Sequence, residues 1–383
     1  MSSQTTCDVR AHLGRPAGMA VVLLPVALSA AVLLVLSARC LADEPAARFP
    51  GKSWEEKSPA EVAMDPARLQ KFIDSLKTPS ANRRGGPEKE SDSHGVVVKD
   101  GYLVASWGKP SKRFNWFSAS KPALSTLLFF AIAEGKLKGV DDGVGDWGWK
   151  LSEKDKAMTF AHLANMVSGY SAKDPPGAAF AYNDLGIQLY WKTLEKVFGN
   201  DIVTAGRKCL NPLEFQDGDV FNEKGRVVAS PRDFARVGWF WMHRGNWNGR
   251  QVLPRELFDK YMKPCVPSDL PISKDSEIDD YLKIGSYGGG NNQVRYGPGL
   301  YGFCWWFNAT VPGTKELNWP SAPTDTFAAM GYGGNNMVMI PSRGVVVAAR
   351  ATWGRAIMGG EEGRFNQNLK LLLEAVNQQP AEK

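Results

Sequence analysis

The sequence predicts an α+β protein, in which an antiparallel sheet of sequence-distant halves is flanked by helices and a mainly helical subdomain is inserted between those halves. Two observations support this. β-Branched and aromatic runs, which favour strands, occur at residues 94–107 and again at 300–352. The chain between them has the apolar spacing of amphipathic helices. A cleft is expected where the sheet and the helical part meet.

The first sheet segment is predicted as a hairpin over 94–107. Two apolar runs flank a turn at Lys99-Asp100-Gly101, and a short Asp-Gly turn between β-branched runs is a strong hairpin signal. Residues 58–78 before it have helical apolar spacing, which Pro66 is expected to break.

The middle of the chain is predicted to contain helices over 118–137, 184–198 and 230–244, the last with Ser230 as its cap. Residues 283–299 are rich in Gly and Asn and predict a loop. The C-terminal part predicts three strands and a final helix, at 300–309, 326–340, 344–352 and 361–376. The resulting division is 1–42 (signal peptide or anchor), 43–117 (first helix and strands), 118–295 (helical subdomain) and 296–383 (remaining strands and last helix).

The N-terminus predicts export. Two arginines precede an apolar run from Ala17 to Ala38, and small residues allow cleavage after Ala42. The run is also long enough to cross a hydrocarbon core of about 30 Å, so an uncleaved anchor stays open as the alternative. Either interpretation places the protein in the periplasm or outside the cell.

Composition excludes several functions. The net charge of +6 is mild and scattered, which argues against a nucleic-acid partner. The three cysteines beyond residue 42 form no Cys-x-x-Cys, and the histidines lack metal-ligand spacing, so no metal or cofactor is predicted. Trp116, Trp305 and Trp306 are assigned to the core in preference to a substrate cleft.

Ser118-Ala-Ser-Lys121 fits a Ser-x-x-Lys pattern, in which a lysine activates a serine nucleophile. The pattern alone is weak, because Ser106-Trp-Gly-Lys109 also fits it. The context differs, however. Ser118 opens an apolar helix, so Ser118 and Lys121 stand one turn apart on the same face.

The chain around these residues resembles class C β-lactamases and their serine-esterase and penicillin-binding relatives, in order from about Ser58 to Val376. The segments that carry the resemblance are 113–122 with 133–137, Phe160–Tyr170, Phe180–Gly186, Arg232–Gly238, Gly245–Pro254 and Phe327–Gly334. The resemblance implies a β-lactamase/transpeptidase-like fold. It also implies that Ser118 is acylated, that Lys121 is its base and that Tyr182 relays protons. The backbone N–H groups of Ser118 and Tyr332 would form the oxyanion hole.

Two positions depart from the family pattern. Asp184 stands where the Tyr-x-Asn motif has an amide; it would either face Lys121 and weaken the base, or cap the following helix. Ala329-Met330-Gly331 stands where β-lactamases have a cation, a hydroxyl residue and Gly. This variant is closer to the esterase and 6-aminohexanoate-dimer hydrolase branch.

The sequence therefore predicts an extracytoplasmic serine hydrolase of small esters, amides or peptides. The alternatives are a penicillin-binding or cell-wall-peptide-binding protein that does not turn over, and a true β-lactamase. A Ser-His-Asp hydrolase is disfavoured, because no Gly-x-Ser-x-Gly motif is present.

Overall fold

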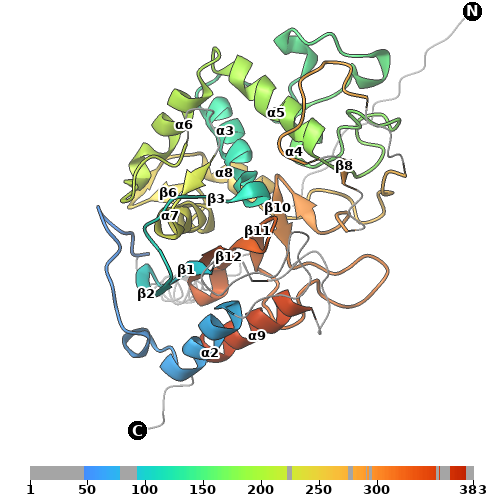
Figure 1. The fold of residues 1–383 in the computed structure, drawn as a ribbon. Helices are drawn as coiled ribbons and strands as arrows, with labels where there is room; N and C mark the ends of the chain where they lie inside the picture. Colours follow the sequence, from blue (N-terminus) through green and yellow to red (C-terminus); the bar gives the residue numbers. More distant parts are fainter. Residues whose placement is uncertain are drawn as a thin grey trace, which may run out of the picture. The chain divides into compact units, whose positions relative to one another are not determined.

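The computed structural model describes residues 47–77, 93–221, 227–274, 279–289, 291–292, 296–350, 353 and 363–376 (Figure 1). These residues belong to one compact unit that spans positions 47–383. The predicted signal segment, 1–42, lies outside the described residues. No helix among the residues that the structure describes is long and apolar enough to cross a membrane.

A seven-stranded antiparallel sheet joins the two ends of the chain, in the order β2-β1-β13-β12-β11-β10-β9. The strands are β1 (His94–Lys99), β2 (Tyr102–Trp107), β9 (Tyr301–Gly302), β10 (Trp305–Phe307), β11 (Phe327–Gly331), β12 (Asn335–Ile340) and β13 (Val345–Arg350). Val97 pairs with Val347, so the predicted hairpin forms its next ladder with a strand of the C-terminal half. The predicted antiparallel sheet of sequence-distant halves is confirmed.

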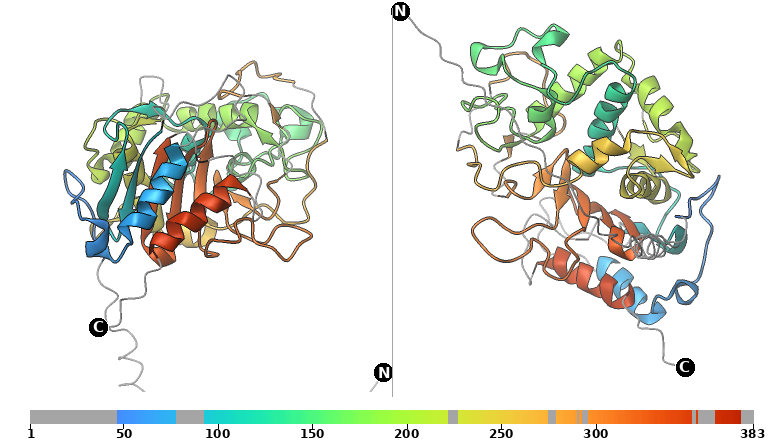
Figure 2. Two further views of the ribbon diagram at one scale, coloured as in Figure 1. Left: turned by 60° about the horizontal axis from the view of Figure 1, so that its bottom comes forward. Right: turned by 180° about the vertical axis from the view of Figure 1, so that it is seen from behind.

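Helices cover both faces of this sheet (Figures 1 and 2). On one face, α2 (Pro66–Lys77) and α9 (Arg364–Val376) lie side by side. On the other face, α7 (Pro231–Met242) packs against β1, β12 and β13. Gly238 allows this close approach, since a Cβ there would lie 2.8 Å from Met337 Sδ and 3.0 Å from Val346 Cγ1. The sheet is therefore buried on both sides.

The segment between β2 and β9 contains most of the remaining helices: α3 (Pro122–Ala133), α4 (Phe160–Ala164), α5 (Asp184–Val197), α6 (Ile202–Leu210) and α8 (Arg255–Tyr261), with 3₁₀ turns at η3 (Phe117–Ser120), η4 (Gly145–Trp147), η5 (Glu153–Asp155) and η6 (Asn211–Leu213). Two-residue strand pairs add β3 (Phe114–Asn115) with β5 (Val228–Ala229), β4 (Tyr182–Asn183) with β8 (Asn291–Asn292) and β6 (Asn246–Trp247) with β7 (Arg250–Gln251).

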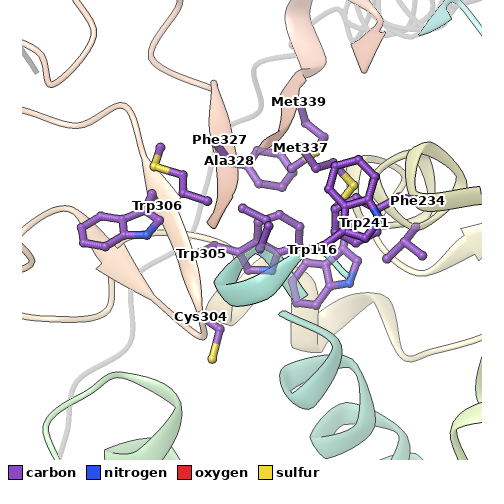
Figure 3. Packing of buried hydrophobic residues seen from close by; sticks show 14 of the residues in the cluster. Trp116, Phe234, Trp241, Cys304, Trp305, Trp306, Phe327, Ala328, Met337 and Met339 are labelled. Carbon is purple, nitrogen blue, oxygen red and sulfur yellow. The ribbon is translucent and has the colours of Figure 1, made fainter. Parts of the chain in front are cut away.

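An aromatic cluster joins the helical segment to the sheet (Figure 3). The ring of Trp305 lies 4.8 Å from that of Trp241 on α7 and 5.2 Å from that of Phe327 on β11. Trp116 stacks on Phe234 at 4.3 Å. Trp116, Trp305 and Trp306 are all buried, which confirms their assignment to the core. This packing holds Trp116, two residues before Ser118, against α7.

Several predicted boundaries need correction. Pro66 does break the first helical segment, into η1 (Pro59–Val62) and α2. The helix predicted over 118–137 is shorter, because it opens with the 3₁₀ turn η3 and α3 ends at Ala133 before Gly135, whose φ is +68°. The strand predicted over 300–309 is split by a tight turn at Phe303 and Cys304. The loop predicted over 283–299 contains the short strand β8.

Candidate active site

Ser118 lies in the tight turn η3 at the start of α3, where its side chain is partly exposed. Phe117 before it has φ +52°, a left-handed conformation that is unfavourable for a phenylalanine. Side chains on either side hold the turn: Asn115 Oδ1 accepts a hydrogen bond from Phe117 N at 2.8 Å, and Ser120 Oγ donates to Phe117 O at 2.6 Å. Ser118 therefore lies partly exposed in a turn that two side-chain hydrogen bonds hold in place.

Lys121 is fully buried one turn further along, with 1% of its surface exposed. Its Nζ lies 2.7 Å from Ser118 Oγ and 3.1 Å from Tyr182 OH. The structure thus brings together Ser118, Lys121 and Tyr182, to which the family resemblance assigns catalytic roles, at distances that allow proton transfer between them. By contrast, Ser106 of the second Ser-x-x-Lys match lies exposed on β2, at the end of the sheet.

Tyr182 is placed by strand pairing, by ring packing and by the helix that follows it. It pairs with Asn292 across β4 and β8, and its ring stacks on Trp306 with centroids 6.1 Å apart. Asn183 caps α5, because its Oδ1 accepts from Leu185 N at 2.8 Å, and its Nδ2 donates to Tyr170 O at 2.6 Å. Tyr182 is itself buried, so its phenol oxygen is fixed beside Lys121.

Asp184 faces Lys121. Its Oδ1 lies 2.6 Å from Lys121 Nζ, and both side chains are nearly inaccessible to solvent. Asn183 provides the cap of α5, so the alternative in which Asp184 caps the helix is wrong. Beyond this ion pair, Asp184 Oδ1 makes no hydrogen bond of good geometry among the described residues. A carboxylate therefore contacts the base directly.

The charge state of Lys121 follows from these neighbours. Burial by itself lowers the pKa of a lysine, because the ammonium loses its hydration. Here the phenol oxygen of Tyr182 and the carboxylate of Asp184, both at contact distance, more than offset burial, so the pKa of Lys121 is raised above its ordinary value. At neutral pH Lys121 in the resting site is consequently an ammonium ion rather than a neutral amine.

The end of β11 lies against η3, the turn that contains Ser118. A Cβ at Gly331 would lie 2.3 Å from Trp116 O and 2.9 Å from Ala119 N, so only glycine lets the strand pass this close. Tyr332 is the next residue in the chain, so its backbone N–H directly follows this close contact. Because β11 contacts η3 here, the predicted pair of oxyanion donors, Ser118 N and Tyr332 N, comes from adjoining elements.

The two residues before Gly331 carry no charge. Ala329 is fully buried and Met330 is 7% exposed. Their strand pairs them with Met337 and Asn336. The strand therefore supplies backbone and apolar atoms at the position where β-lactamases are expected to have a cation.

Tyr287 is a neighbour of the site that the sequence did not indicate. Its backbone N donates to Asp184 O at 3.0 Å, and its ring centre lies 5.8 Å from Lys121 Nζ. Asp280 holds this loop: its carboxylate accepts from Tyr170 OH at 2.5 Å and from Gly285 N at 2.7 Å. The Tyr-x-Asp motif gave no signal for this contact, since it depends on a loop a hundred residues away in the chain.

Other features lie apart from these residues. Cys209, Cys265 and Cys304 are free thiols. Among the described ranges, no three metal-ligating side chains gather in one place. A cavity of about 690 Å³ between α5 and α6 contains none of the residues above; it is lined by Gln188, Trp191, Lys192, Glu195, Asn200, Asp201, Ile202, Val203, Thr204 and Arg207.

Comparisons with known proteins place this arrangement in the class of β-lactamase/transpeptidase-like folds. Three solved structures resemble the chain. A penicillin-binding protein homologue from Caulobacter crescentus is 16% identical, with a TM-score of 0.52 over 81% of this chain and 97% of that one. The hydrolase EstCE1, which has promiscuous acyltransferase activity, is 14% identical, with a TM-score of 0.53 over 80% and 99%. A protein from Bacillus anthracis assigned as a 6-aminohexanoate-dimer hydrolase is 14% identical, with a TM-score of 0.52 over 87% and 89%.

The family model for beta-lactamase matches residues 91–367, and the chain therefore belongs to the beta-lactamase family. An uncharacterised protein from Alkalihalophilus pseudofirmus is 20% identical over 272 residues, which cover 62% of this chain and 73% of that protein. The predicted family and fold are confirmed, and a serine hydrolase is the kind of enzyme that this family supports.

Proposed function

We propose that this chain is an extracytoplasmic serine hydrolase that cleaves a small ester or amide through an acyl-enzyme on Ser118. The observation that carries the proposal is the convergence of Ser118 Oγ and Tyr182 OH on the buried Lys121 Nζ, at 2.7 and 3.1 Å. A partly exposed serine beside a buried amine fits an activated nucleophile better than a structural contact. The hydrolase names among the similar structures agree with this proposal.

The chemistry follows from which group holds each proton. Lys121 in its neutral form takes the proton of Ser118 Oγ while that oxygen attacks the substrate carbonyl carbon. The carbonyl oxygen, now negative, accepts hydrogen bonds from the backbone N–H groups of Ser118 and Tyr332. Tyr182 then donates its proton to the leaving oxygen or nitrogen, and Lys121 reprotonates Tyr182. In the second half, Lys121 and Tyr182 take a proton from water while its oxygen attacks the acyl carbon. That proton passes to Ser118 Oγ as the ester bond breaks, which releases the acid and restores the neutral amine.

The test is the intact mass of the protein after incubation with a fluorophosphonate and, separately, with an activated ester. The expected result is one fluorophosphonate adduct on Ser118 and rapid discharge of the ester adduct. Ser118→Ala should abolish labelling and turnover. Ser106→Ala is the matched control, because Ser106 starts the other Ser-x-x-Lys match but lies exposed on β2, and it should leave both intact. Labelling that survives Ser118→Ala would contradict the proposal.

The Asp184 contact favours a second candidate, a penicillin-binding or cell-wall-peptide-binding protein that is acylated without turnover. A carboxylate 2.6 Å from Lys121 Nζ keeps the base protonated and slows the attack of water as well. A stable penicilloyl adduct on Ser118 would support this candidate. A true β-lactamase ranks third, because Ala329 offers no cation for the substrate carboxylate.

The location outside the cytoplasm and the small-molecule partner are part of the proposal. They rest on the N-terminal apolar run and on the uncharged end of β11. Intact mass of the protein recovered from the periplasm or medium tests the location. A mature chain that begins at Asp43 indicates cleavage, whereas a full-length chain in the membrane fraction indicates an anchor.

A further inference from the structure

Two large apolar side chains are exposed at the same place. Among the residues that the structure describes, the large hydrophobic side chains classed as exposed are Phe117, with 41% of its surface accessible, and Tyr332, with 51%. Their ring centres lie 5.9 Å apart and their planes meet at 68°, an edge-to-face arrangement. We call them the aromatic pair. The other large hydrophobic side chains that the structure describes are buried or half-buried. Exposed aromatic side chains that lie together on such a surface indicate a binding site.

The aromatic pair borders the proposed oxyanion hole on both sides. Phe117 precedes Ser118 on η3, and Tyr332 follows Gly331 on β11. The backbone contact between Gly331 and η3 brings the two elements together, and the rings of the neighbouring residues Phe117 and Tyr332 lie 5.9 Å apart. A substrate whose carbonyl oxygen reaches the backbone N–H groups of Ser118 and Tyr332 would therefore lie close to both rings.

We infer that the aromatic pair binds the acyl portion of the substrate, and that this portion carries an uncharged aromatic or bulky apolar group. The inference rests on the proposed function and names its substrate class. The leaving group must face Tyr182 OH to be protonated, so the acyl side of the carbonyl is the part left for the rings of Phe117 and Tyr332. An aromatic acyl group can stack on one ring and meet the edge of the other.

The electrostatics of the site favour an uncharged acyl group. The ammonium of Lys121 is paired with Asp184 at 2.6 Å, so its charge is largely compensated. Ala329 and Met330, which lie on β11 shortly before Tyr332, are buried and provide no charge for an anionic substituent. A carboxylate on the acyl portion would lose its hydration against the aromatic pair without gaining a charged partner on this strand.

The experiment compares 4-nitrophenyl phenylacetate with 4-nitrophenyl acetate, which share one leaving group. The quantity measured is the acyl preference, the ratio of kcat/KM for phenylacetate to that for acetate. We expect a preference of about tenfold or more for the unaltered chain. Phe117→Ala and Tyr332→Ala should each lower it about three- to tenfold, as expected for the loss of one aromatic contact. Tyr332→Phe keeps the ring and should keep the preference.

A matched control is Tyr102→Ala on β2, four strand spacings, or about 19 Å, from β11 in the sheet order. This substitution also removes a partly exposed aromatic ring, whose centre lies 4.0 Å from Lys57 Nζ. It should leave the acyl preference unchanged. If Phe117→Ala does not fold, Phe117→Gly replaces it, because glycine suits the left-handed backbone and also removes the ring.

An acyl preference that stays the same in both ring-removing variants, or an unaltered chain that prefers acetate, would overturn the inference. The proposed function fails in a different way, by the lack of a fluorophosphonate adduct on Ser118. The two failures are therefore distinguishable in the same set of proteins.

Discussion

Asp184→Asn is the substitution that tests the electrostatics of the site most directly. The change is nearly isosteric and removes the negative charge that lies 2.6 Å from Lys121 Nζ. It leaves the cap of α5 in place, because Asn183 provides that cap. In a plot of kcat/KM against pH, the acidic limb is the range in which activity rises as Lys121 loses its proton. Asp184→Asn should therefore move this limb without a change in the backbone around Tyr182.

The size of the effect can be bounded. With an effective dielectric constant of about 20, two unit charges 2.6 Å apart attract by about 6 kcal/mol, which is an upper limit because both groups also lose hydration. A charge partner at contact distance shifts a neighbouring pKa by about 1–3 units. The pKa of Lys121 is raised in the folded protein, so the neutral amine becomes available only as the pH rises. Asp184→Asn should lower the acidic limb by about 1–3 pH units.

The assay is the pH profile of kcat/KM for an activated ester, read between pH 6 and 10 with thermal unfolding at each pH. At pH 7 we expect a gain of about tenfold or more, since each unit of pKa changes the neutral fraction tenfold. Asp201→Asn is the matched control. It makes the same exchange at the N-cap of α6, where asparagine caps equally well, and should leave the profile unchanged.

Stability should change in the opposite direction to activity. Because the folded pKa of Lys121 lies above its unfolded value of about 10.4, the stabilisation from the pair is fully present at neutral pH and is lost as the pH rises through the folded pKa. Breaking a buried pair costs roughly 3–5 kcal/mol, less what the amine recovers by losing its proton. An acidic limb that does not move would refute this reasoning, because Asp184 would then not control the pKa of Lys121. A severe loss of activity in a folded variant would refute it as well and would make Asp184 a participant in proton transfer.

Two further substitutions test the remaining geometry. Tyr182→Phe removes the oxygen that lies 3.1 Å from Lys121 Nζ, so kcat for an ester with a poor leaving group should fall by about 10²- to 10⁴-fold. The unfolding temperature should not change. A near-normal kcat would show that Tyr182 takes no part in the mechanism. Gly331→Ala places a methyl group 2.3 Å from Trp116 O, so β11 must move away from η3. We expect kcat to fall by about 10²-fold or more and fluorophosphonate labelling of Ser118 to slow in parallel. Normal rates would show that Tyr332 N is not an oxyanion donor.

Local signals predicted the elements that short-range chemistry determines. The Asp100-Gly101 turn fixed the β1–β2 hairpin, and both residues have positive φ in the structure. Ser230 accepts a hydrogen bond from Asp233 N at 3.1 Å and starts α7 as predicted. The Ser118–Lys121 spacing placed two side chains on one face of a turn, and the structure puts their polar atoms 2.7 Å apart. Each of these depends on residues within four positions of one another.

Features that depend on distant contacts could not be predicted in this way. The strand expected over 300–309 is interrupted because Phe303 and Cys304 both have left-handed φ, and neither residue type indicates a turn. Phe303 is held by partners far away in the chain: its N–H donates to Asn165 Oδ1 and its carbonyl accepts from Ser125 Oγ. Tyr287 reaches the site through a loop whose anchor is Asp280. Only tertiary structure supplies such constraints.

The residue type of Asp184 left two roles open, contact with Lys121 and capping of α5. Asp and Asn at a helix start can both cap it, so sequence alone could not say which of Asn183 and Asp184 does so. The geometry assigns the cap to Asn183 and the ion pair to Asp184. This assignment bears on both half-reactions, because the same neutral amine must accept a proton from Ser118 and later help to remove one from water. If the unaltered chain is acylated but does not turn over, Asp184→Asn should speed release of the acyl group as well as its formation. An enzyme that already turns over should instead show the gain mainly as a shifted pH profile.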